Sequence, residues 1–432
     1  MHEAKIIFPW QRKSWNIYEK IINKNINNIA QLDNILSAIS PGVFKPKMAE
    51  NLFARYYNDE MPNKIPLNYV IDKIIPTLQH LVLSGREVFT SLRVIKSGSN
   101  SNLTLSRLET AVLISCAWFG LFNYNYIYND DINNYPEFIF LNMFQEQNIF
   151  VLQCFMVYIM RIINYMENQD ENFLSGIIII VRKKINRGDW TDNKNKITEP
   201  FIGESYQYNT PAKLQFGFCD EYILKDIFKS TMSLCELSML SRFESFITML
   251  VCEKLEPDES IAVLGCEKII NCDGQLSGIK FIGIADEKEE RSTGSEILVR
   301  HAIIFADCSP KTAVVDQLIN DFDRDLNKAY CAASILNFSG PEFIAGGLWQ
   351  YPGRSSINQV KFIQQLIAAS AANKHLIYYP PSNESEAEVT EFIEWAMKIN
   401  LSINQLYLLY KKIANKEGDI FKLIMNEYKL LI

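Results

Sequence analysis

The run GIIIIVRK, at residues 176–183, is where the pattern of apolar residues changes from a helical to a strand-like period. Its consecutive isoleucines are β-branched and too few for a helix, which favours a buried strand. Before this run, apolar residues recur at intervals of three and four, as in LNYVIDKIIPTLQHLVLSGREVFTSL at residues 67–92. After it, short apolar runs alternate with longer amphipathic stretches. The change predicts an N-terminal helical region followed by an α/β unit.

Further strands are predicted after this point. They are AKLQFGF at 212–218, SIAVLGC at 260–266, IKFIGIA at 279–285, HAIIFADC at 301–308 and HLIYYPP at 375–381. Helices are expected between them, at 225–254, 314–336 and 357–374, and two more at 388–400 and 402–415. Strands that alternate with helices predict a sheet that is at least partly parallel. We therefore expect a helical region at 1–175, an α/β core at 176–380 and closing helices at 381–432.

Two helices expected within residues 1–175 can be recognised from particular residues. Ser106 is followed three residues later by Glu109, which predicts a capping box at the start of a helix. The most apolar window, residues 148–166, is interrupted by Gln153 and Arg161, so a buried amphipathic helix is expected there and no membrane span. The N-terminus lacks the continuous apolar run of a signal peptide.

Composition narrows the classes of function. The net charge is −7, which argues against a nucleic-acid partner. The nine cysteines show no CxxC spacing and the four histidines lie far apart, so we expect reduced buried thiols and no metal site. Reduced thiols imply an intracellular protein, in the cytoplasm or nucleus.

One carboxylate stands alone in an otherwise uncharged stretch. In STMSLCELSMLS, at residues 230–241, Glu236 is the single charged residue. It is either a catalytic acid or an ordinary carboxylate at the polar edge of a helix. The residues alone leave both interpretations open.

Several blocks in the same order resemble the poly(ADP-ribose) glycohydrolase family. The segment RDLNKAYCAA at 324–333 is similar to that family's Arg-Glu-Leu-Asn-Lys-Ala-Tyr-Cys block. The segments KFIQQLIAASAANKHLIYY at 361–379, ESFITMLVCEKLEPDESIAVLGCEK at 244–268 and LTLSRLETAVLISCAWFGLF at 103–122 resemble further family elements. The resemblance implies a macrodomain-like mixed sheet flanked by helices, with an N-terminal all-helical region packed on it.

The resemblance also gives Glu236 a role. Its position matches the family's second catalytic glutamate, which protonates the departing ribose oxygen and then activates water. Cys235 stands where the family has the first glutamate, which helps to hold the ribose hydroxyls. A thiol is only a weak hydrogen-bonding substitute for that carboxylate.

The glycine loop that approaches the ligand's diphosphate in the family is replaced here. Its three glycines correspond to Leu224, Lys225 and Asp226. Side chains are excluded where bare backbone must approach a phosphate or adopt positive φ. Further ligand-binding positions of the family correspond to Phe218 and Asp220 before this loop, Gln207 at the adenine-reading acid and Gln275 at a tyrosine.

The family's second phosphate loop corresponds to GLWQYPGRSS, at residues 347–356. Gly347 and Trp349 match the family pattern, and Arg354 replaces the aromatic residue that covers the ligand. Gln350 and Pro352 replace glycines, and a proline has no amide to donate to phosphate. Arg354 could instead supply a new phosphate contact.

Two hypotheses for function follow. The first is a catalytically degenerate member that acts as a structural or protein-interaction subunit of a larger assembly, extending to a capsid or other virion component. The alternative is an active glycohydrolase or an ADP-ribose-binding protein that uses Glu236. Neither hypothesis requires a cofactor.

Overall fold

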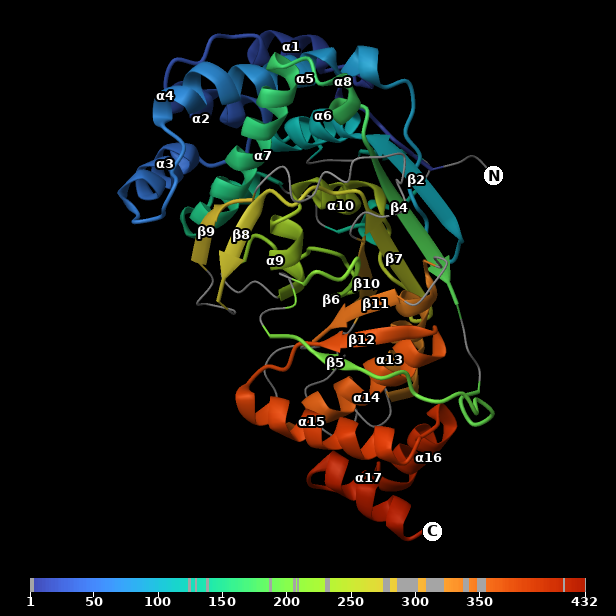
Figure 1. Ribbon diagram of the computed structural model, residues 1–432. Helices are drawn as coiled ribbons and strands as arrows, with labels where there is room; N and C mark the ends of the chain where they lie inside the picture. Colours follow the sequence, from blue (N-terminus) through green and yellow to red (C-terminus); the bar gives the residue numbers. More distant parts are fainter. Residues whose placement is uncertain are drawn as a thin grey trace.

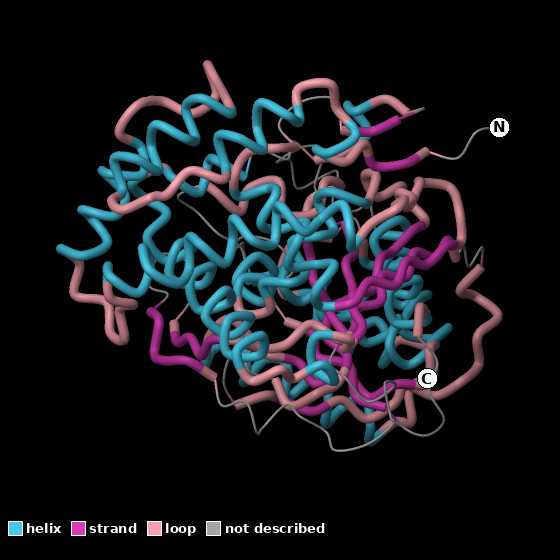
Figure 2. The backbone as a smooth tube through the Cα atoms, turned by 90° about the horizontal axis from the view of Figure 1, so that it is seen from above, coloured by secondary structure: helices cyan, strands magenta, loops and turns pink. Residues whose placement is uncertain are grey.

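A computed structural model describes most of the chain. The residues described are 4–122, 126–128, 130–136, 140–185, 189–204, 207, 210–229, 234–274, 280–285, 302–307, 322–336, 342–347, 355–414 and 416–431. A mixed sheet lies at the centre, with the N-terminal helices at one end and the C-terminal helices at the other (Figure 1). Seen from above, helices surround the strands (Figure 2).

The N-terminal region is mainly helical, as predicted. Its helices are α1 (Trp15–Ile22), α2 (Ile29–Ile39), α3 (Met48–Asn58), α4 (Leu67–Tyr69), the π-helical turn η2 (Val70–Ile74), α5 (Ile75–Val88), α6 (Arg107–Trp118), α7 (Ile149–Glu167) and α8 (Glu171–Leu174). Short 3-10 turns are η1 (Pro9–Gln11), η3 (Ile132–Asn134), η4 (Phe140–Phe144) and η5 (Glu146–Asn148). The predicted capping box at Ser106 is confirmed, since its side chain accepts from the Glu109 amide and the Glu109 side chain accepts from the Ser106 amide.

The expectation that the region is all helical is wrong at two places. Strand β2 (Ser101–Ser106) belongs to the main sheet, and β1 (Lys5–Ile6) pairs with β3 (Ile127–Tyr128). In β2, Leu103 and Leu105 are buried while Asn102 and Thr104 are exposed, which is the alternation of a half-buried strand. This two-residue period was present in the sequence but lay directly before a strong helix start.

The main sheet has the order β2-β4-β7-β10-β6-β11-β12-β5. Its remaining strands are β4 (Ile177–Lys184), β5 (Phe201–Ile202), β6 (Leu214–Cys219), β7 (Glu259–Leu264), β10 (Ala302–Asp307), β11 (Glu342–Gly346) and β12 (Lys374–Tyr378). The pairs from β10 through β6, β11 and β12 to β5 are parallel, and those from β10 through β7 and β4 to β2 are antiparallel. The predicted mixed sheet is confirmed.

Most strand predictions held, but β9 has an unexpected partner, and β5, β8 (Ile270–Asp273) and β11 were not predicted. The strand predicted at 279–285 is β9 (Lys280–Ile284), but it pairs with β8 (Ile270–Asp273) in a separate two-stranded sheet. Strand β11 was not predicted. It is short and lies in a Gly- and Ala-containing stretch with little strand propensity of its own, and its two parallel neighbours hold it in place.

The helices of the α/β part cover the sheet. They are α9 (Leu234–Leu240), η7 (Phe243–Phe246), α10 (Ile247–Val251), α13 (Phe322–Ser334), α14 (Ser355–Ala371), α15 (Asn383–Lys398), α16 (Ile403–Ile413) and α17 (Ile420–Lys429). The single helix predicted over 225–254 is wrong. Its first residues form turns, and Arg242 leaves the helical conformation between α9 and η7.

The most apolar helix, α7, is long and apolar enough to cross a membrane by length and composition, but 72% of its best window is buried inside the protein. Phe155 stacks on Trp118 of α6, and Tyr158 stacks on Phe243 of η7. These contacts on both flanks are those of a core helix.

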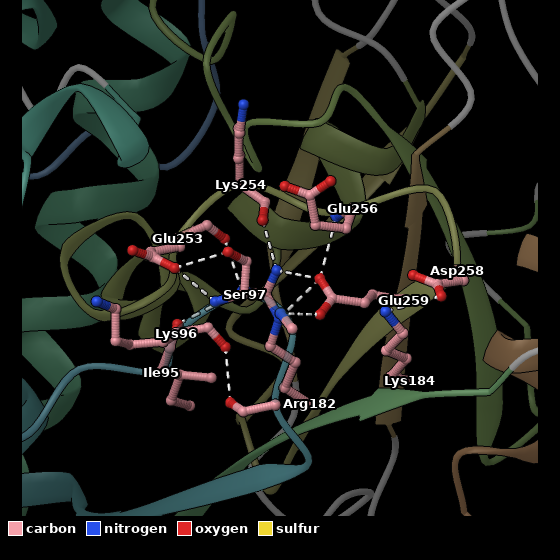
Figure 3. A network of polar contacts seen from close by, with 12 residues as sticks. Ile95, Lys96, Ser97, Arg182, Lys184, Glu253, Lys254, Glu256, Asp258 and Glu259 are labelled. Carbon is pink, nitrogen blue, oxygen red and sulfur yellow. Dashed lines mark hydrogen bonds and ion pairs between the residues drawn. The ribbon is translucent and has the colours of Figure 1, made fainter.

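A buried polar network joins the helical region to the sheet (Figure 3). The guanidinium of Arg182, on β4, donates to the carbonyls of Ile95 and Glu253 and to the carboxylate of Glu259 on β7. That carboxylate also accepts from the Glu256 amide at 3.0 Å. The charges are therefore fully paired and hydrogen-bonded, as buried charges must be.

Candidate functional site

The candidate site lies at the carboxyl ends of the parallel strands. Strands β6 and β11 are hydrogen-bonded neighbours and run in the same direction. The loop at 220–229 follows β6, and Gly347 follows β11, so both open at the same edge of the sheet. This edge is where open α/β sheets bind ligands.

Glu236 and Cys235 lie in the first turn of α9, and both are 7% exposed. The helix is tied to β6 by Gln215, whose Nε2 donates to the Ser238 Oγ at 2.8 Å. Glu236 is therefore a buried carboxylate beside the strand that leads into the loop, and not the solvated edge of a helix.

Leu224 has the backbone conformation of a glycine. Its φ is 63°, and its side chain is buried, with 2% exposed. Left-handed backbone costs an ordinary L-residue roughly 1–2 kcal/mol. Among the described residues, the other non-glycines with positive φ are Lys47, Asn63, Gln169, Asn373 and Asn400, so Leu224 is the apolar one in this set. The loop retains a glycine-type turn and carries an isobutyl group into the core.

The next two residues of the loop carry charges that are paired locally. Lys225 donates to the carboxylate of Asp220 at 2.6 Å, and Lys229 lies 2.5 Å from the carboxylate of Asp226. Burial lowers the pKa of Lys225, but the hydrogen bond and charge of Asp220 outweigh it and the pKa is raised. Both lysines of the loop are thus paired within it.

The loop is also attached to neighbouring segments. The hydroxyl of Tyr222 donates to the Asn133 carbonyl at 3.1 Å, and the Leu255 amide donates to the Glu221 carbonyl at 2.7 Å. The first contact comes from the helical region and the second from the segment after α10. The loop therefore rests on two separate parts of the chain.

On the β11 side, Gly347 has both backbone groups occupied by one side chain. Its amide donates to Gln365 Oε1 at 3.0 Å, and Gln365 Nε2 donates to its carbonyl at 2.9 Å. A Cβ on Gly347 would lie 3.0 Å from Gln207 Oε1 and 3.1 Å from the Tyr379 carbonyl. A side chain here would require Gln207 or the Tyr379 backbone to shift by a few tenths of an ångström, so packing favours glycine. The Gly347 amide points to α14.

Gln207 and Phe218 have packing roles. The Gln207 Nε2 donates to the carbonyls of Phe216 on β6 and Ala345 on β11, at 2.7 and 3.3 Å. The Phe218 ring stacks on Phe216 with centroids 5.3 Å apart. Gln207 thus bridges β6 and β11 just beyond their last paired residues. It is the residue expected to correspond to the family's adenine-binding acid.

Comparison of the chain with models of known protein families agrees with this fold. Residues 67–182 match the family model described as "Poly (ADP-ribose) glycohydrolase (PARG), helical domain", and residues 189–388 match the one described as "Poly (ADP-ribose) glycohydrolase (PARG), Macro domain fold". The chain belongs to the poly(ADP-ribose) glycohydrolase family. The macro domain match contains both loops of the candidate site.

This poly(ADP-ribose) glycohydrolase homologue adds elements at both ends of the matched regions. Helices α1 to α3 precede residue 67, and α16 and α17 follow residue 388. Within the helical-domain match lie β2 and most of β4, so the helical domain supplies strands to the central sheet.

Three of the predicted site residues, Gln275, Trp349 and Arg354, lie outside the described residues. Of the described ones, Gln207 lies against Gly347 where β6 and β11 end. Asp220 and Lys225 pair with each other in the loop after β6. Gln365 was not foreseen, although a fully buried glutamine inside the alanine-rich helix α14 was a visible signal of a polar contact. Among the described residues, no group of three His, Cys, Asp or Glu side chains could hold a metal ion.

Proposed function

We propose that this member of the poly(ADP-ribose) glycohydrolase family has lost hydrolysis and acts as a structural or protein-interaction subunit of a larger assembly. The observation that carries the proposal is Leu224, a buried leucine in left-handed backbone at the position of a family glycine. The loop has kept its turn, and the bare backbone that the ligand would approach now carries a side chain.

The charged residues of the loop also support the loss of ligand binding. A diphosphate needs cationic or amide donors that are free to turn toward it. The Lys225 ammonium is engaged by Asp220, and Asp226 adds a carboxylate to the loop. An anionic ligand would have to separate these pairs and lie beside two carboxylates.

Glu236 by itself is not sufficient for hydrolysis. Glu236 keeps the position of the family's general acid, but a carboxylate accelerates glycosyl transfer only when the substrate is held in reacting geometry. Cys235 cannot replace the carboxylate that would hold the ribose. Loss of the phosphate loop and of this carboxylate together removes the positioning.

The first experiment is titration calorimetry with ADP-ribose, together with a release assay on poly(ADP-ribose). We expect no saturable heat with ligand concentrations up to the millimolar range, and no release of ADP-ribose above that of Glu236→Gln. Micromolar binding, or turnover that Glu236→Gln abolishes, contradicts the proposal. A triple variant, Leu224→Gly with Lys225→Gly and Asp226→Gly, restores the family's loop and should gain ADP-ribose affinity if the loop is what blocks the ligand.

The second candidate function is an active glycohydrolase or an ADP-ribose-binding protein. The observation that favours it is the placement of Glu236, which is buried at the start of α9, the helix that Gln215 ties to β6. If this second candidate is correct, the wild type binds ADP-ribose, and the triple glycine variant binds it no more tightly.

The assembly role has a separate test. Affinity purification of the tagged chain from its native source, followed by mass spectrometry, should recover a stoichiometric protein partner, and virion components if the chain is packaged. Filter binding at low salt should show no retention of nucleic acid, given the net charge of −7.

A further inference from the structure

A basic helix face and an acidic helix face lie at opposite ends of the molecule. Helix α1 belongs to the N-terminal end and α15 to the C-terminal end, with the central sheet between them (Figure 1). Each helix buries one side in the core and leaves the other side in solvent. Because the sheet separates the two helices, their solvent faces cannot meet within one chain.

Helix α1 is held firmly on its inner side. Trp15 and Ile22 are 5% and 0% exposed, and the Gln79 Nε2 of α5 donates to the Lys24 carbonyl at 2.8 Å. The opposite side carries Ile17, which is 63% exposed. Exposed lysines surround it in the turn before the helix, in the helix and just after it: Lys13, Lys20 and Lys24.

These four residues form one surface, here called the basic face. The lysines are four residues before Ile17, three after it and seven after it, and such spacings place side chains on the same side of a helix. Glu19 is two residues from Ile17 and therefore lies on another side of α1. Among the described residues, none forms an ion pair with Lys13, Lys20 or Lys24.

Helix α15 shows the opposite charge. Its inner side carries Val389 and Phe392, both buried, and the Phe392 ring stacks on Phe421 of α17 with centroids 4.4 Å apart. Ala387 is exposed on the outer side, with exposed glutamates three residues before it and four and seven residues after it. These residues form the acidic face: Glu384, Ala387, Glu391 and Glu394. None of the three glutamates is in an ion pair with a residue that the structure describes.

The spacings of the two faces match when the helices of two copies pack antiparallel. Lys20 is three residues after Ile17, and Glu384 is three residues before Ala387. If Ile17 of one copy packs on Ala387 of the next, Lys20 therefore lies opposite Glu384. The small alanine side chain lets the two helices approach closely around the isoleucine.

A second pair of charges fits the same register. Lys13 is four residues before Ile17, and Glu391 is four residues after Ala387, so the antiparallel arrangement also brings these two opposite each other. The match of sign and spacing at both positions points to a second copy of this chain as the partner of each face.

We propose that copies of this chain associate head to tail, with the basic face of one copy packed against the acidic face of the next. Each copy uses a different face at each end, so the contact is heterologous and continues into an open chain or closes into a ring. The inference rests on the proposed role as a structural subunit and names a partner for it.

The physical nature of the contact sets the conditions for its detection. Exposed ion pairs contribute little individually and are screened by salt, and a contact between two short helix faces is small. We therefore expect weak self-association that increases with protein concentration at low ionic strength. It should disappear at about 1 M salt, where the Debye length is about 3 Å.

The test is sedimentation velocity of the full chain over a series of concentrations. Lys20→Glu alone and Glu384→Lys alone should each weaken self-association by about fivefold or more, because each replaces an attraction by a repulsion. The two substitutions in one chain invert the pair and should restore association to the wild-type level. A role of either residue in folding alone does not predict this rescue.

Three variants serve as controls. Lys45→Glu and Glu417→Lys change the net charge equally at exposed residues outside the two faces, and they should leave association unchanged. Ile17→Ser removes the apolar centre of the basic face without a change of charge and should weaken association. Circular dichroism of each variant checks that it is folded.

The proposal is overturned if the wild type shows no concentration-dependent sedimentation at low salt. It is also overturned if the doubly substituted chain stays dissociated, or if the two charge controls weaken association as much as the variants of the faces. Titration with ADP-ribose separates the two proposals. Self-association together with ADP-ribose binding would contradict only the loss of ligand binding, and absence of both would contradict only the head-to-tail contact.

Discussion

Arg182 and Glu259 form an ion pair that is completely buried between β4 and β7. Arg182 also donates to backbone carbonyls of the segments on either side, so the pair connects the strand from the helical domain with the macrodomain strand. Removing one member leaves a buried charge without compensation.

Arg182→Met is expected to destabilise the protein by about 3–5 kcal/mol, the usual cost of breaking a buried pair from one side. Urea unfolding followed by circular dichroism measures the change. The matched control is Lys184→Met on the same strand, whose pair with Asp258 is 3.0 Å long but 48% and 25% exposed, and which should change stability by less than about 1 kcal/mol. Equal effects of the two variants would contradict the assignment.

The Leu224→Gly variant should be more stable than the Leu224→Ala variant, which is the reverse of the usual order. Both lose a buried side chain, which costs about 2–5 kcal/mol for leucine to alanine. Alanine retains the strain of a φ of 63°, whereas glycine relieves about 1–2 kcal/mol of it. We therefore expect the glycine variant to be the more stable by about 1 kcal/mol, measured by urea unfolding. At an ordinary backbone position, alanine is the more stable of the two.

Gln365→Leu should destabilise the protein by about 2–4 kcal/mol, because it leaves both backbone groups of Gly347 buried without their partner. Thermal and urea unfolding give the value. Gln147→Leu, a change at an exposed glutamine, is the control and should stay within about 0.5 kcal/mol. A small effect at Gln365 would show that other donors replace it.

The cysteines provide a prediction on chemical reactivity. The eight described cysteines are all buried, and burial raises the pKa of Cys252 and of Cys272 to about 12. A raised pKa lowers the thiolate fraction at pH 8, and thiolate is the reacting form. With Ellman's reagent, at most the one cysteine outside the described residues, Cys308, should react quickly in the native protein, and all nine in guanidinium. Rapid reaction of two or more native thiols would refute this.

Local patterns were enough to place most elements. The capping box at Ser106, the strand at 176–183 and the period of α14 each depend on neighbours within one or two turns of the chain. The same patterns failed at β11 and in the broken helix over 225–254. A short strand can be held by its two neighbours, and a helix can be interrupted by turns that long-range contacts favour.

At the candidate site, order along the chain identified which residues would meet but not what they would do there. Leu224 was expected to fill the place of a glycine, and its burial and positive φ agree with that expectation. Gln207 was assigned to ligand binding from its position, yet its amide spans two strands. The Lys225–Asp220 pair joins two side chains, and the hydrogen bonds between Gln365 and Gly347 join a side chain to backbone. No spacing rule indicates either contact.

The amino-acid sequence by itself determined the family and the mixed α/β sheet, because these depend on residue identity and on the period of apolar residues. Only the tertiary structure decided that Lys225 and Lys229 are paired within the site loop and that Gly347 gives its amide to α14. Those contacts depend on which polar groups come together when folding removes water from them. Residues far apart in the chain carry no local sequence pattern that predicts such a contact.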